Sequence, residues 1–379
     1  MSEWSEILDY LERSGLLRRP VTIDGPQGPR VHIGDREFLC FCSNNYLDLA
    51  NHPDLIDAAT DAARRYGTGT GASRLVSGSM TVHHKLEEAV ARLKRTDAAL
   101  LFPTGYMANL GTIPALVGRG DTIFCDRLNH ASVFDGCRLA SATLRVYPHR
   151  DADALDHLLR RERGGRTLVV TDSVFSMDGD LAPLPDLLEV CERHGATLMI
   201  DEAHATGVMG ATGRGAAEHF GIEPGRIPVL MGTLSKAVGS IGGYVAGSTD
   251  LIDLLLNRAR SFIYTTAPPP PACAAAAAGL RLIQAEPQRR TALWERTRQL
   301  HDGLRRLGLD IGPSQTPITP VIVGDARAAL ALAQKLLERG ILAPAIRPPT
   351  VPEGSARIRI TPMATHTTDD VAALLDAIA

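Results

Sequence analysis

Lys236 is the residue of this chain whose type and surroundings best suit covalent chemistry. The sequence has 40 basic residues, but only four of them are lysines. Lys236 follows an apolar, strand-like run and lies among serine, threonine and glycine residues, in a loop that can approach a ligand closely. An amine there can lose its contacts with water, shift its pKa and attack an aldehyde. Lys85, Lys94 and Lys335 occur in amphipathic runs, so we expect them on solvated helix faces.

Two further chemical groups come at the ends of predicted strands. Asp201 closes an apolar run and is followed by Glu202 and His204. The segment Phe102–Asn109 passes from a strand to a helix start, where free backbone N–H groups suit a phosphate. Each group alone could be a helix cap, an ion pair or a core residue. Together, a carboxylate, a lysine one strand later and a phosphate-binding helix start fit pyridoxal 5′-phosphate, because the carboxylate would keep the pyridine nitrogen protonated and the lysine would hold the aldehyde.

Two nucleotide-binding motifs are only partly present. Asp-Glu-Ala-His also occurs in helicases, where it serves a nucleotide–metal site, but the necessary phosphate loop contains Gly-Lys and this dipeptide is absent from the chain. The stretch Gly67–Gly78 contains the Gly-x-Gly-x-x-Ala form of the dinucleotide fingerprint, but a helical pattern precedes it where a strand is needed. We therefore exclude the helicase and nicotinamide interpretations. We expect the glycine-rich stretch to be a loop that contacts a ligand or a second subunit.

The composition is that of a globular protein without an electrostatic case for nucleic acid or membrane binding. The formal charge is −3, with 44% hydrophobic and 22% charged residues. No apolar run reaches the roughly 18 residues that cross a bilayer, and the acidic start lacks a signal pattern, so we expect a cytoplasmic protein. The six cysteines are scattered, which predicts reduced thiols and no metal site. Cys40 and Cys42 would face the same side of one strand.

Alternation of helical patterns with short apolar runs predicts an α/β fold. Its mainly parallel sheet has seven strands covered on both faces, and ligands bind beyond the carboxyl ends of such strands. The expected strands are 98–103, 121–125, 143–147, 166–172, 196–201, 227–232 and 243–247, and the expected helices between them are 81–95, 104–117, 129–140, 151–161 and 184–194.

We expect the chain to fold as three parts. An N-terminal helix and hairpin segment covers 1–45, with Gly25–Pro29 as the hairpin turn. A large cofactor-binding domain covers 46–265, and a small C-terminal α+β domain covers 266–379.

Seven motifs spread over the chain carry a resemblance. They are Asn45-Tyr-Leu, Gly71-Ala-Ser-Arg-Leu-Val-Ser-Gly, Thr104-Gly-Tyr-Met-Ala-Asn, Asp126-Arg-Leu-Asn-His-Ala-Ser, Ser173-Val-Phe-Ser-Met-Asp-Gly-Asp, Asp201-Glu-Ala-His-Ala-Thr-Gly and Thr233-Leu-Ser-Lys. On these motifs the chain resembles the α-oxoamine synthases over nearly its whole length. That family consists of pyridoxal-phosphate enzymes of fold type I, the aminotransferase-like fold, and joins an amino acid to an acyl-CoA with decarboxylation.

The resemblance implies roles around the cofactor ring. Lys236 would be the Schiff-base lysine, and Asp201 the partner of the pyridine nitrogen. His130 would stack on the ring, while Ser176 and His204 would approach its phenolic oxygen. The catalytic residues implied are therefore Lys236, His130, Asp201 and His204.

The resemblance also implies a phosphate site and a homodimer. The backbone of Gly105 and Tyr106 and the hydroxyl of Thr233 would hold the phosphate. Thr265 or Thr266 would reach in from a second subunit, so the active sites would be shared.

Five residues are candidates for binding substrate. Asn44 and Arg359 would bind the carboxylate of the amino acid, because a guanidinium group forms a fork that matches it. Arg347, Arg18 and Arg19 are candidates for the acyl-CoA end, with surface arginines as the alternative.

The substrates implied are L-alanine and pimeloyl-CoA. The variants Ser73–Gly78 and Ala345–Pro352 favour this pair over the substrates of glycine C-acetyltransferase and 5-aminolevulinate synthase, which share the core motifs. A catalytically silent scaffold subunit is the alternative outside enzymes. It would normally lack the lysine, whereas Lys236, Asp201 and His204 are all present.

Overall fold

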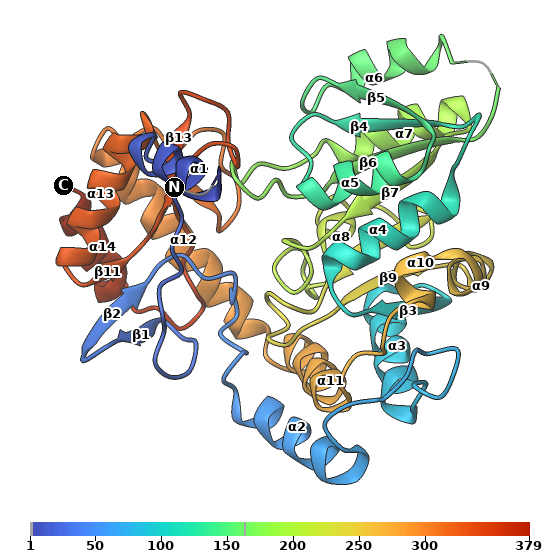
Figure 1. Ribbon diagram of the computed structural model, residues 1–379, viewed down its shortest axis with the longest axis horizontal. Coiled ribbons are helices and arrows are strands. Elements are labelled where there is room, and N and C mark those ends of the chain that lie inside the picture. Colours follow the sequence, from blue (N-terminus) through green and yellow to red (C-terminus); the bar gives the residue numbers. More distant parts are fainter. Residues whose placement is uncertain (1–2, 163) are drawn as a thin grey trace. The chain divides into compact units, whose positions relative to one another are not determined.

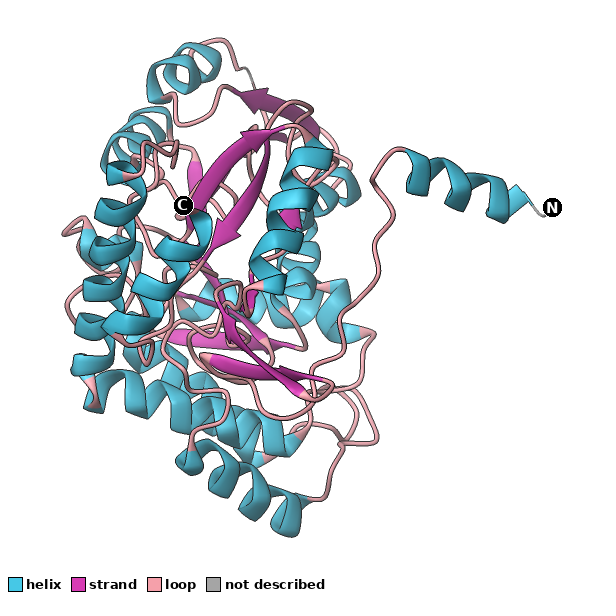
Figure 2. Cartoon of the chain, turned by 90° about the vertical axis from the view of Figure 1, so that its left-hand side faces the viewer, coloured by secondary structure: helices cyan, strands magenta, loops and turns pink. Residues whose placement is uncertain are grey.

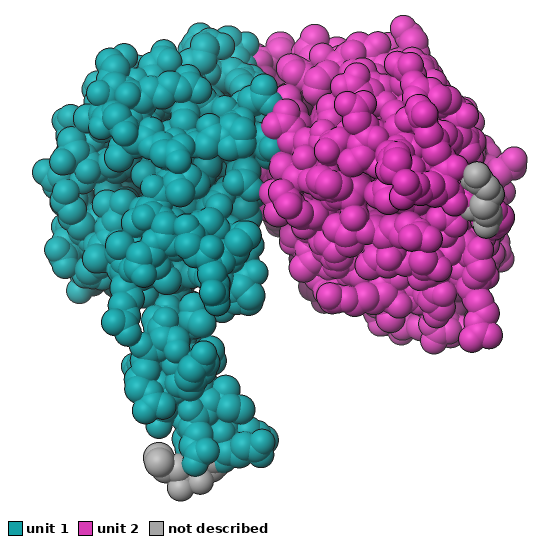
Figure 3. All heavy atoms as spheres, turned by 90° about the horizontal axis from the view of Figure 1, so that it is seen from above, with its two compact units in different colours: residues 1–48, 177–180, 291–379 teal, residues 49–176, 181–290 magenta. Residues whose placement is uncertain are grey.

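The computed structural model describes residues 3–162 and 164–379, which form two compact units. One unit comprises residues 49–176 and 181–290, and the other comprises 1–48, 177–180 and 291–379 (Figure 3). The expected division at 45/46 and 265/266 differs from this clustering in three respects, the smallest of which is that residues 46–48 and 177–180 belong to the smaller unit. The N-terminal segment belongs with the C-terminal part of the chain, and residues 266–290 belong with the larger unit.

The larger unit is built on a seven-stranded sheet of the expected kind. Its strand order is β3-β9-β8-β7-β6-β4-β5, and all pairs are parallel except the two that β9 makes. The strands are β3 (Ala98–Phe102), β4 (Thr122–Asp126), β5 (Thr143–Tyr147), β6 (Thr167–Asp172), β7 (Thr197–Asp201), β8 (Val229–Thr233) and β9 (Gly243–Gly247). Every residue of β4, β8 and β9 is buried, as continuous apolar strands covered on both faces require.

Helices of the larger unit flank this sheet or pack on one another (Figures 1 and 2). They are α2 (Pro53–Tyr66), α3 (Thr81–Lys94), α4 (Gly105–Leu116), α5 (Ala131–Leu139), α6 (Ala152–Leu159), α7 (Leu184–His194), α8 (Ala216–His219), α9 (Thr249–Arg258), α10 (Arg260–Ile263) and α11 (Pro270–Ala285). The start of α4 comes close to β9, because a Cβ on Gly243 would lie 2.5 Å from the carbonyl oxygen of Thr104. Only glycine allows this approach, and it fixes the helix start that was expected to bind phosphate.

The smaller unit contains two three-stranded sheets. Strands β1 (Arg30–Ile33), β2 (Arg36–Cys40) and β11 (Ile341–Leu342) form one sheet. Strands β10 (Thr319–Gly324), β13 (Ala356–Ile360) and β12 (Ala345–Ile346) form an antiparallel sheet. The helices of this unit are α1 (Glu3–Arg13), α12 (Pro287–Arg306), whose first residues belong to the larger unit, α13 (Ala326–Glu338) and α14 (Thr368–Ile378). Its core joins Leu300, Leu336, Ile358 and Leu374.

The expected hairpin turn was wrong. Strands β1 and β2 pair antiparallel from Arg30 with Leu39 to Ile33 with Arg36, so the turn is Gly34-Asp35 and not Gly25–Pro29. Gly34 has φ +58°, and such a two-residue turn favours a glycine with positive φ. The Gly25–Pro29 stretch precedes the strands as a loop.

The expectation of a solvated Lys94 was also wrong. Lys94 is only 2% exposed, and its Nζ donates to Glu202 Oε2 at 2.5 Å, to Thr206 Oγ1 at 2.9 Å and to the carbonyl oxygen of Arg214. Helical periodicity places Lys94 one turn beyond Val90, on the buried face of α3. A buried carboxylate that pairs with the lysine makes that position tolerable for a charge. In contrast, Lys85 and Lys335 are exposed, as expected.

Two further findings concern metal sites and membrane-spanning helices. Among residues 3–162 and 164–379, no cluster of three or more His, Cys, Asp or Glu residues could hold a metal ion. In the same part of the chain, no helix is both long enough and apolar enough to pass through a bilayer.

Candidate active site

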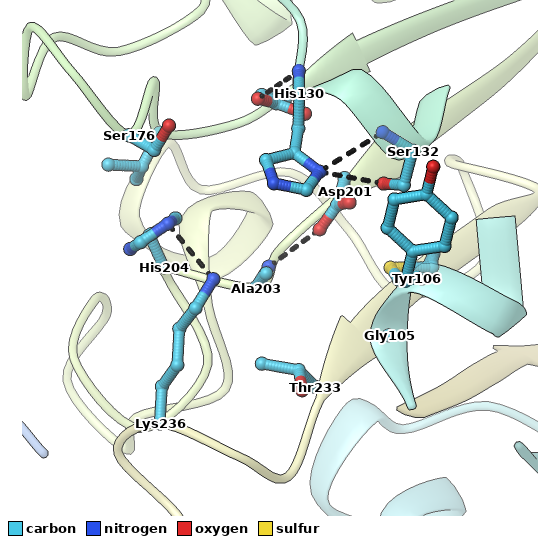
Figure 4. Close-up of a pocket in the computed structure, with 13 residues that line it drawn as sticks. Gly105, Tyr106, His130, Ser132, Ser176, Asp201, Ala203, His204, Thr233 and Lys236 are labelled. Atoms are coloured by element: carbon cyan, nitrogen blue, oxygen red, sulfur yellow. Dashed lines mark hydrogen bonds between the residues drawn. The ribbon is translucent and has the colours of Figure 1, made fainter. Parts of the chain in front are cut away.

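A cavity of about 200 Å³ lies at the carboxyl end of the parallel strands of the larger unit. Its walls combine the strand ends with the start of α4 and the loop after β8 (Figure 4). The lining residues are Gly105, Tyr106, His130, Ser132, Asp172, Val174, Ser176, Asp201, Ala203, His204, Met231, Thr233 and Lys236. The structure therefore brings together every residue of the larger unit for which a place around the cofactor was expected, except Thr265 and Thr266.

The side chains of Lys236 and His204 are in contact in the wall of the cavity. The Nζ of Lys236 lies 2.9 Å from Nε2 of His204, and Figure 4 shows both side chains pointing into the pocket. His204 comes from the turn after β7, and Lys236 from the loop after β8. Because these strands are parallel neighbours, their following loops meet at the same edge of the sheet. This pairing places a nucleophilic amine beside a group that can exchange protons with it.

Asp201 is held in one orientation by two donors. The side-chain amide of Asn109 donates to Oδ2 at 2.9 Å, and the backbone N–H of Ala203 donates to Oδ1 at 2.8 Å. Ser173 anchors the strand end by donating its hydroxyl to the carbonyl oxygen of Asp201 at 2.9 Å. The carboxylate is buried and lines the cavity, so it can pair with a cationic ring nitrogen there.

His130 presents a neutral ring to the cavity. Its Nδ1 accepts a hydrogen bond from the backbone N–H of Ser132 at 3.2 Å and lies 2.8 Å from the Ser132 hydroxyl. Burial lowers the pKa of His130, although the charge of Asp201 acts in the opposite direction. An uncharged, oriented imidazole suits stacking on an aromatic ligand. His130 is also the N-cap of α5, which fixes where its ring emerges.

The start of α4 and the end of β8 form a cradle that suits a phosphate. The Thr104 side chain caps the helix by accepting from the N–H of Met107 at 3.1 Å, and the N–H groups of Gly105 and Tyr106 precede the helical hydrogen bonds. Thr233 lies opposite, and its hydroxyl donates to the carbonyl oxygen of Gly242 at 2.8 Å. A Cβ on Gly105 would come within 3.3 Å of Thr233, so glycine keeps the cradle open.

Several site residues were not assigned a role from the sequence. Asn109 and Ser132 orient the expected residues, and Asp172 is a second carboxylate in the wall of the cavity. Asn109 could have been noticed as a lone amide in the apolar sequence of α4. Asp172 ends β6 as Asp201 ends β7, so the strand-end signal that identified Asp201 applied to it equally.

The remaining expected residues lie outside this cavity. Thr265 and Thr266 follow α10, and the neighbouring Ala267 donates its N–H to the carbonyl oxygen of Ala72 at 3.0 Å. This hydrogen bond ties their segment to the glycine-rich loop.

The candidates in the smaller unit form two groups. Arg359 donates to Asn44 Oδ1 at 3.0 Å and is buried, so the two expected carboxylate ligands lie together. Arg347 donates to the carbonyl oxygens of Gly15 and Leu17, and Arg18 donates to that of Pro348. Arg19 is exposed.

These residues fit pyridoxal phosphate by the chemistry of their donors and acceptors. An amine suits the aldehyde, a doubly oriented carboxylate suits the pyridine nitrogen, and a helix start with a facing hydroxyl suits the phosphate. Lys236, Asp201, Gly105, Tyr106 and Thr233 would hold the cofactor.

Comparisons with known proteins also point to a pyridoxal-phosphate enzyme. The family model for aminotransferase class I and II matches residues 36–378. The chain is 52% identical to the 8-amino-7-oxononanoate synthase of Geobacter sulfurreducens over 98% of this chain and 96% of the relative. It is 50% identical to the enzyme of the same name from Nitrosococcus oceani over 97% of both chains. Among solved structures, serine palmitoyltransferase from S. paucimobilis with a bound PLP–myriocin aldimine is 32% identical, covers 99% of this chain and 95% of its own, and has a TM-score of 0.94.

The chain therefore belongs to the α-oxoamine synthase family of fold-type I pyridoxal-phosphate enzymes. It is an acyltransferase whose cofactor is pyridoxal 5′-phosphate. The sequence-based predictions of the family, the fold class and the cofactor are confirmed.

Proposed function

We propose that this enzyme condenses L-alanine with pimeloyl-CoA, releasing coenzyme A and carbon dioxide and forming 8-amino-7-oxononanoate, a step of biotin biosynthesis. The observation that carries the proposal is the identity of about half of all residues, over nearly the whole length, to curated 8-amino-7-oxononanoate synthases. Identity to serine palmitoyltransferase, which keeps the fold, is only 32%. We place the reaction in the cytoplasm.

The Lys236–His204 pair would perform the proton transfers. When bound, the cofactor supplies an aldehyde for the amino group and a ring that takes up electrons. The Nζ of Lys236 would remove the α-proton of the amino acid and later return a proton to the product. His204, 2.9 Å from Nζ, can accept or donate a proton as the charge on the amine changes. With the cofactor bound, Asp201 would stabilise the positive charge on the pyridine nitrogen, and His130 would exclude water from one face of the ring.

Arg359 and Asn44 are proposed to bind the carboxylate of the amino acid. Arg359 is fixed on β13 and buried, with its guanidinium held by Asn44. A guanidinium offers two parallel donors to a carboxylate, which lysine cannot. We therefore expect Arg359→Lys to raise KM for the amino acid by roughly tenfold or more, since losing a hydrogen bond to a charged group costs about 1.5–3 kcal/mol. An unchanged KM would remove Arg359 from the substrate site.

Arg347, Arg18 and Arg19 are proposed for the acyl-CoA end. The hydrogen bonds from Arg347 to the carbonyl oxygens of Gly15 and Leu17 support the proposal, because they position the segment that carries Arg18 and Arg19. Positive charges on such a segment suit the phosphates of coenzyme A.

A homodimer with shared active sites is proposed as the assembly. Four exposed apolar side chains of the larger unit support it: Leu75, Val76, Ile241 and Tyr264 are 50%, 80%, 50% and 71% exposed. Three of them lie in the two segments that the Ala267–Ala72 hydrogen bond joins. Exposed apolar groups of this kind mark protein interfaces, and Thr265 and Thr266 adjoin Tyr264. A monomer by analytical ultracentrifugation would overturn this assembly.

The experiment that tests the substrates is a measurement of coenzyme A thiol release. Purified, cofactor-loaded enzyme is given L-alanine or glycine with pimeloyl-, acetyl- or succinyl-CoA. We expect release with L-alanine and pimeloyl-CoA only. Preference for glycine with a short acyl-CoA would retain the mechanism and replace the substrates, and absence of release with every pair would favour the scaffold alternative.

A further inference from the structure

Asp172 and Asp201 end neighbouring strands at the same level. Strands β6 and β7 are parallel, and their register pairs Asp172 directly with Asp201. Neighbouring strands lie roughly 4.8 Å apart, so the two carboxyl groups leave the same edge of the sheet close together. Both residues line the cofactor cavity, and both are buried, with 4% and 6% exposure.

The two carboxyl groups have different surroundings. Asp201 accepts hydrogen bonds on both oxygens, from Asn109 and from Ala203. Asp172 accepts on Oδ2 only, from the backbone N–H of His130 at 3.0 Å. Its Oδ1 is buried and has no hydrogen-bond partner among residues 3–162 and 164–379. A buried oxygen without a partner is costly, which points to a partner that arrives with a ligand.

The groups around Asp172 favour its uncharged form. Burial is the largest effect and the charge of Asp201 the second, and both raise the pKa of Asp172 well above its usual value. Asp126, at the end of β4, acts in the same direction. The backbone N–H of His130 and the amine of Lys236 oppose these effects without cancelling them.

We infer that Asp172 stands in the cofactor pocket as a neutral carboxylic acid, whose Oδ2 holds the His130 turn and whose Oδ1 carries a proton that it donates, as a hydrogen bond, to an acceptor atom of the bound cofactor. An uncharged acid can lie beside the ionised Asp201 without opposing the negative charge that the ring takes up during the reaction. The inference rests on the cofactor site of the proposed function and is independent of which amino acid and thioester react.

The test compares two substitutions of Asp172 with one of Asp201. In Asp172→Asn the amide oxygen can accept from His130 N–H and the NH₂ group can replace the carboxyl O–H, whereas Asp172→Ala supplies neither. The matched control is Asp201→Asn, which makes the same change in the paired carboxylate. Two properties are measured: the apparent Tm of the cofactor-free protein at several pH values, and the Kd for pyridoxal phosphate by equilibrium dialysis.

The pH dependence of Tm reports the protonation of Asp172 directly. A carboxyl whose folded pKa is raised contributes stability that is fully present below the unfolded pKa of about 3.9 and is lost as the pH rises toward the folded pKa. Asparagine does not titrate. We therefore expect Asp172→Asn to gain in Tm relative to the wild type by roughly 2 °C or more between pH 5 and pH 8. A difference that stays constant with pH, or that shrinks as the pH rises, would overturn the inference.

The affinity for pyridoxal phosphate tests whether Asp172 donates a hydrogen bond to the cofactor. We expect the Kd of Asp172→Asn to stay within about threefold of the wild-type value, and that of Asp172→Ala to rise roughly tenfold, because the one hydrogen bond to the cofactor is lost and such a bond is worth up to about 1.5 kcal/mol. Asp201→Asn should also weaken binding, since its amide replaces a needed charge. Equal losses in Asp172→Asn and Asp172→Ala would show that Asp172 acts as a carboxylate and contradict the inference. Failure of the wild type to bind the cofactor would instead contradict the site itself.

Discussion

Two lysines of the larger unit contact the turn after β7, but one is enclosed by protein and the other lines a cavity. Lys94, at the end of α3, is enclosed by Glu202, Thr206 and the carbonyl oxygen of Arg214. Lys236 faces a cavity and has the ring nitrogen of His204 beside it. The adjacent residues Asp201 and Glu202 serve the two regions separately, because consecutive side chains at a strand end point to opposite sides.

This comparison shows that charge pairing, and not burial as such, separates a structural lysine from a reactive one. Burial is the largest single effect and lowers the pKa of Lys94, but the charges and hydrogen bonds of Glu202 and Tyr244 together outweigh it, so the pKa is raised and the amine stays protonated. A protonated amine in a closed network has no lone pair for an aldehyde. Lys236 has a ring nitrogen of His204 2.9 Å from its Nζ, and this group can exchange protons with the amine during nucleophilic and base chemistry.

The largest expected effect comes from removing the reactive lysine. We expect Lys236→Ala to lower kcat by roughly 10³-fold or more, because the same amine serves as base and as cofactor ligand. Coenzyme A release measures it, and Lys335→Ala, in an exposed part of α13, is the matched control. Turnover near the wild-type rate would contradict the distinction between the two lysines, since Lys236 would then be no more reactive than Lys94.

Removing the structural lysine should affect stability first. We expect Lys94→Met to lower the free energy of unfolding by about 3–5 kcal/mol, because Glu202 would be left buried without its partner. Urea unfolding of the cofactor-free protein measures the loss, with exposed Lys85→Met as control. The double variant Lys94→Met with Glu202→Gln should recover part of it. A loss below about 1 kcal/mol would place the pair in the class of exposed ion pairs.

The stability lost in Lys94→Met should also not shrink as the pH rises from 6 to 9. The folded pKa of Lys94 is raised above its unfolded value of about 10.4, so its stabilising contribution is fully present below that value and is lost only as the pH rises through the folded pKa. A deficit that shrinks between pH 6 and 9 would mean that Lys94 loses its proton in the folded state, as is expected of a reactive lysine.

We expect the smallest loss of stability at Tyr244, at the edge of the hydrogen-bond network around Lys94. Tyr244 Oη and Thr206 Oγ1 are 2.7 Å apart, and Tyr244 is fully buried. We expect Tyr244→Phe to cost about 1 kcal/mol, the typical contribution of one hydrogen bond, and to leave the Kd for pyridoxal phosphate unchanged. A weaker affinity for the cofactor would show that the Lys94 network extends its influence into the pocket.

Much of the fold followed from patterns that are local in the sequence. Each of the seven expected strands of the large sheet is present, and β5, α7 and β9 have the expected limits. Apolar runs bounded by glycine and polar residues specify such strands without reference to distant residues. The hairpin turn was misplaced because Gly-Pro-Gln-Gly-Pro and Gly34-Asp35 are both turn sequences, and only the strand register chooses between them.

Short segments of the chain were enough to predict which loop carries the reactive lysine, which strand ends carry Asp201 and His204, and which cofactor they suit, because side-chain chemistry and strand periodicity are local properties. Three relations became visible in the folded chain alone: Lys94 is enclosed by Glu202, Asn109 orients Asp201, and Asp172 lies beside Asp201. These relations depend on strand order and helix docking. Strand order and docking bring distant residues together, and burial among those residues sets whether a charged group is stable, reactive or neutral.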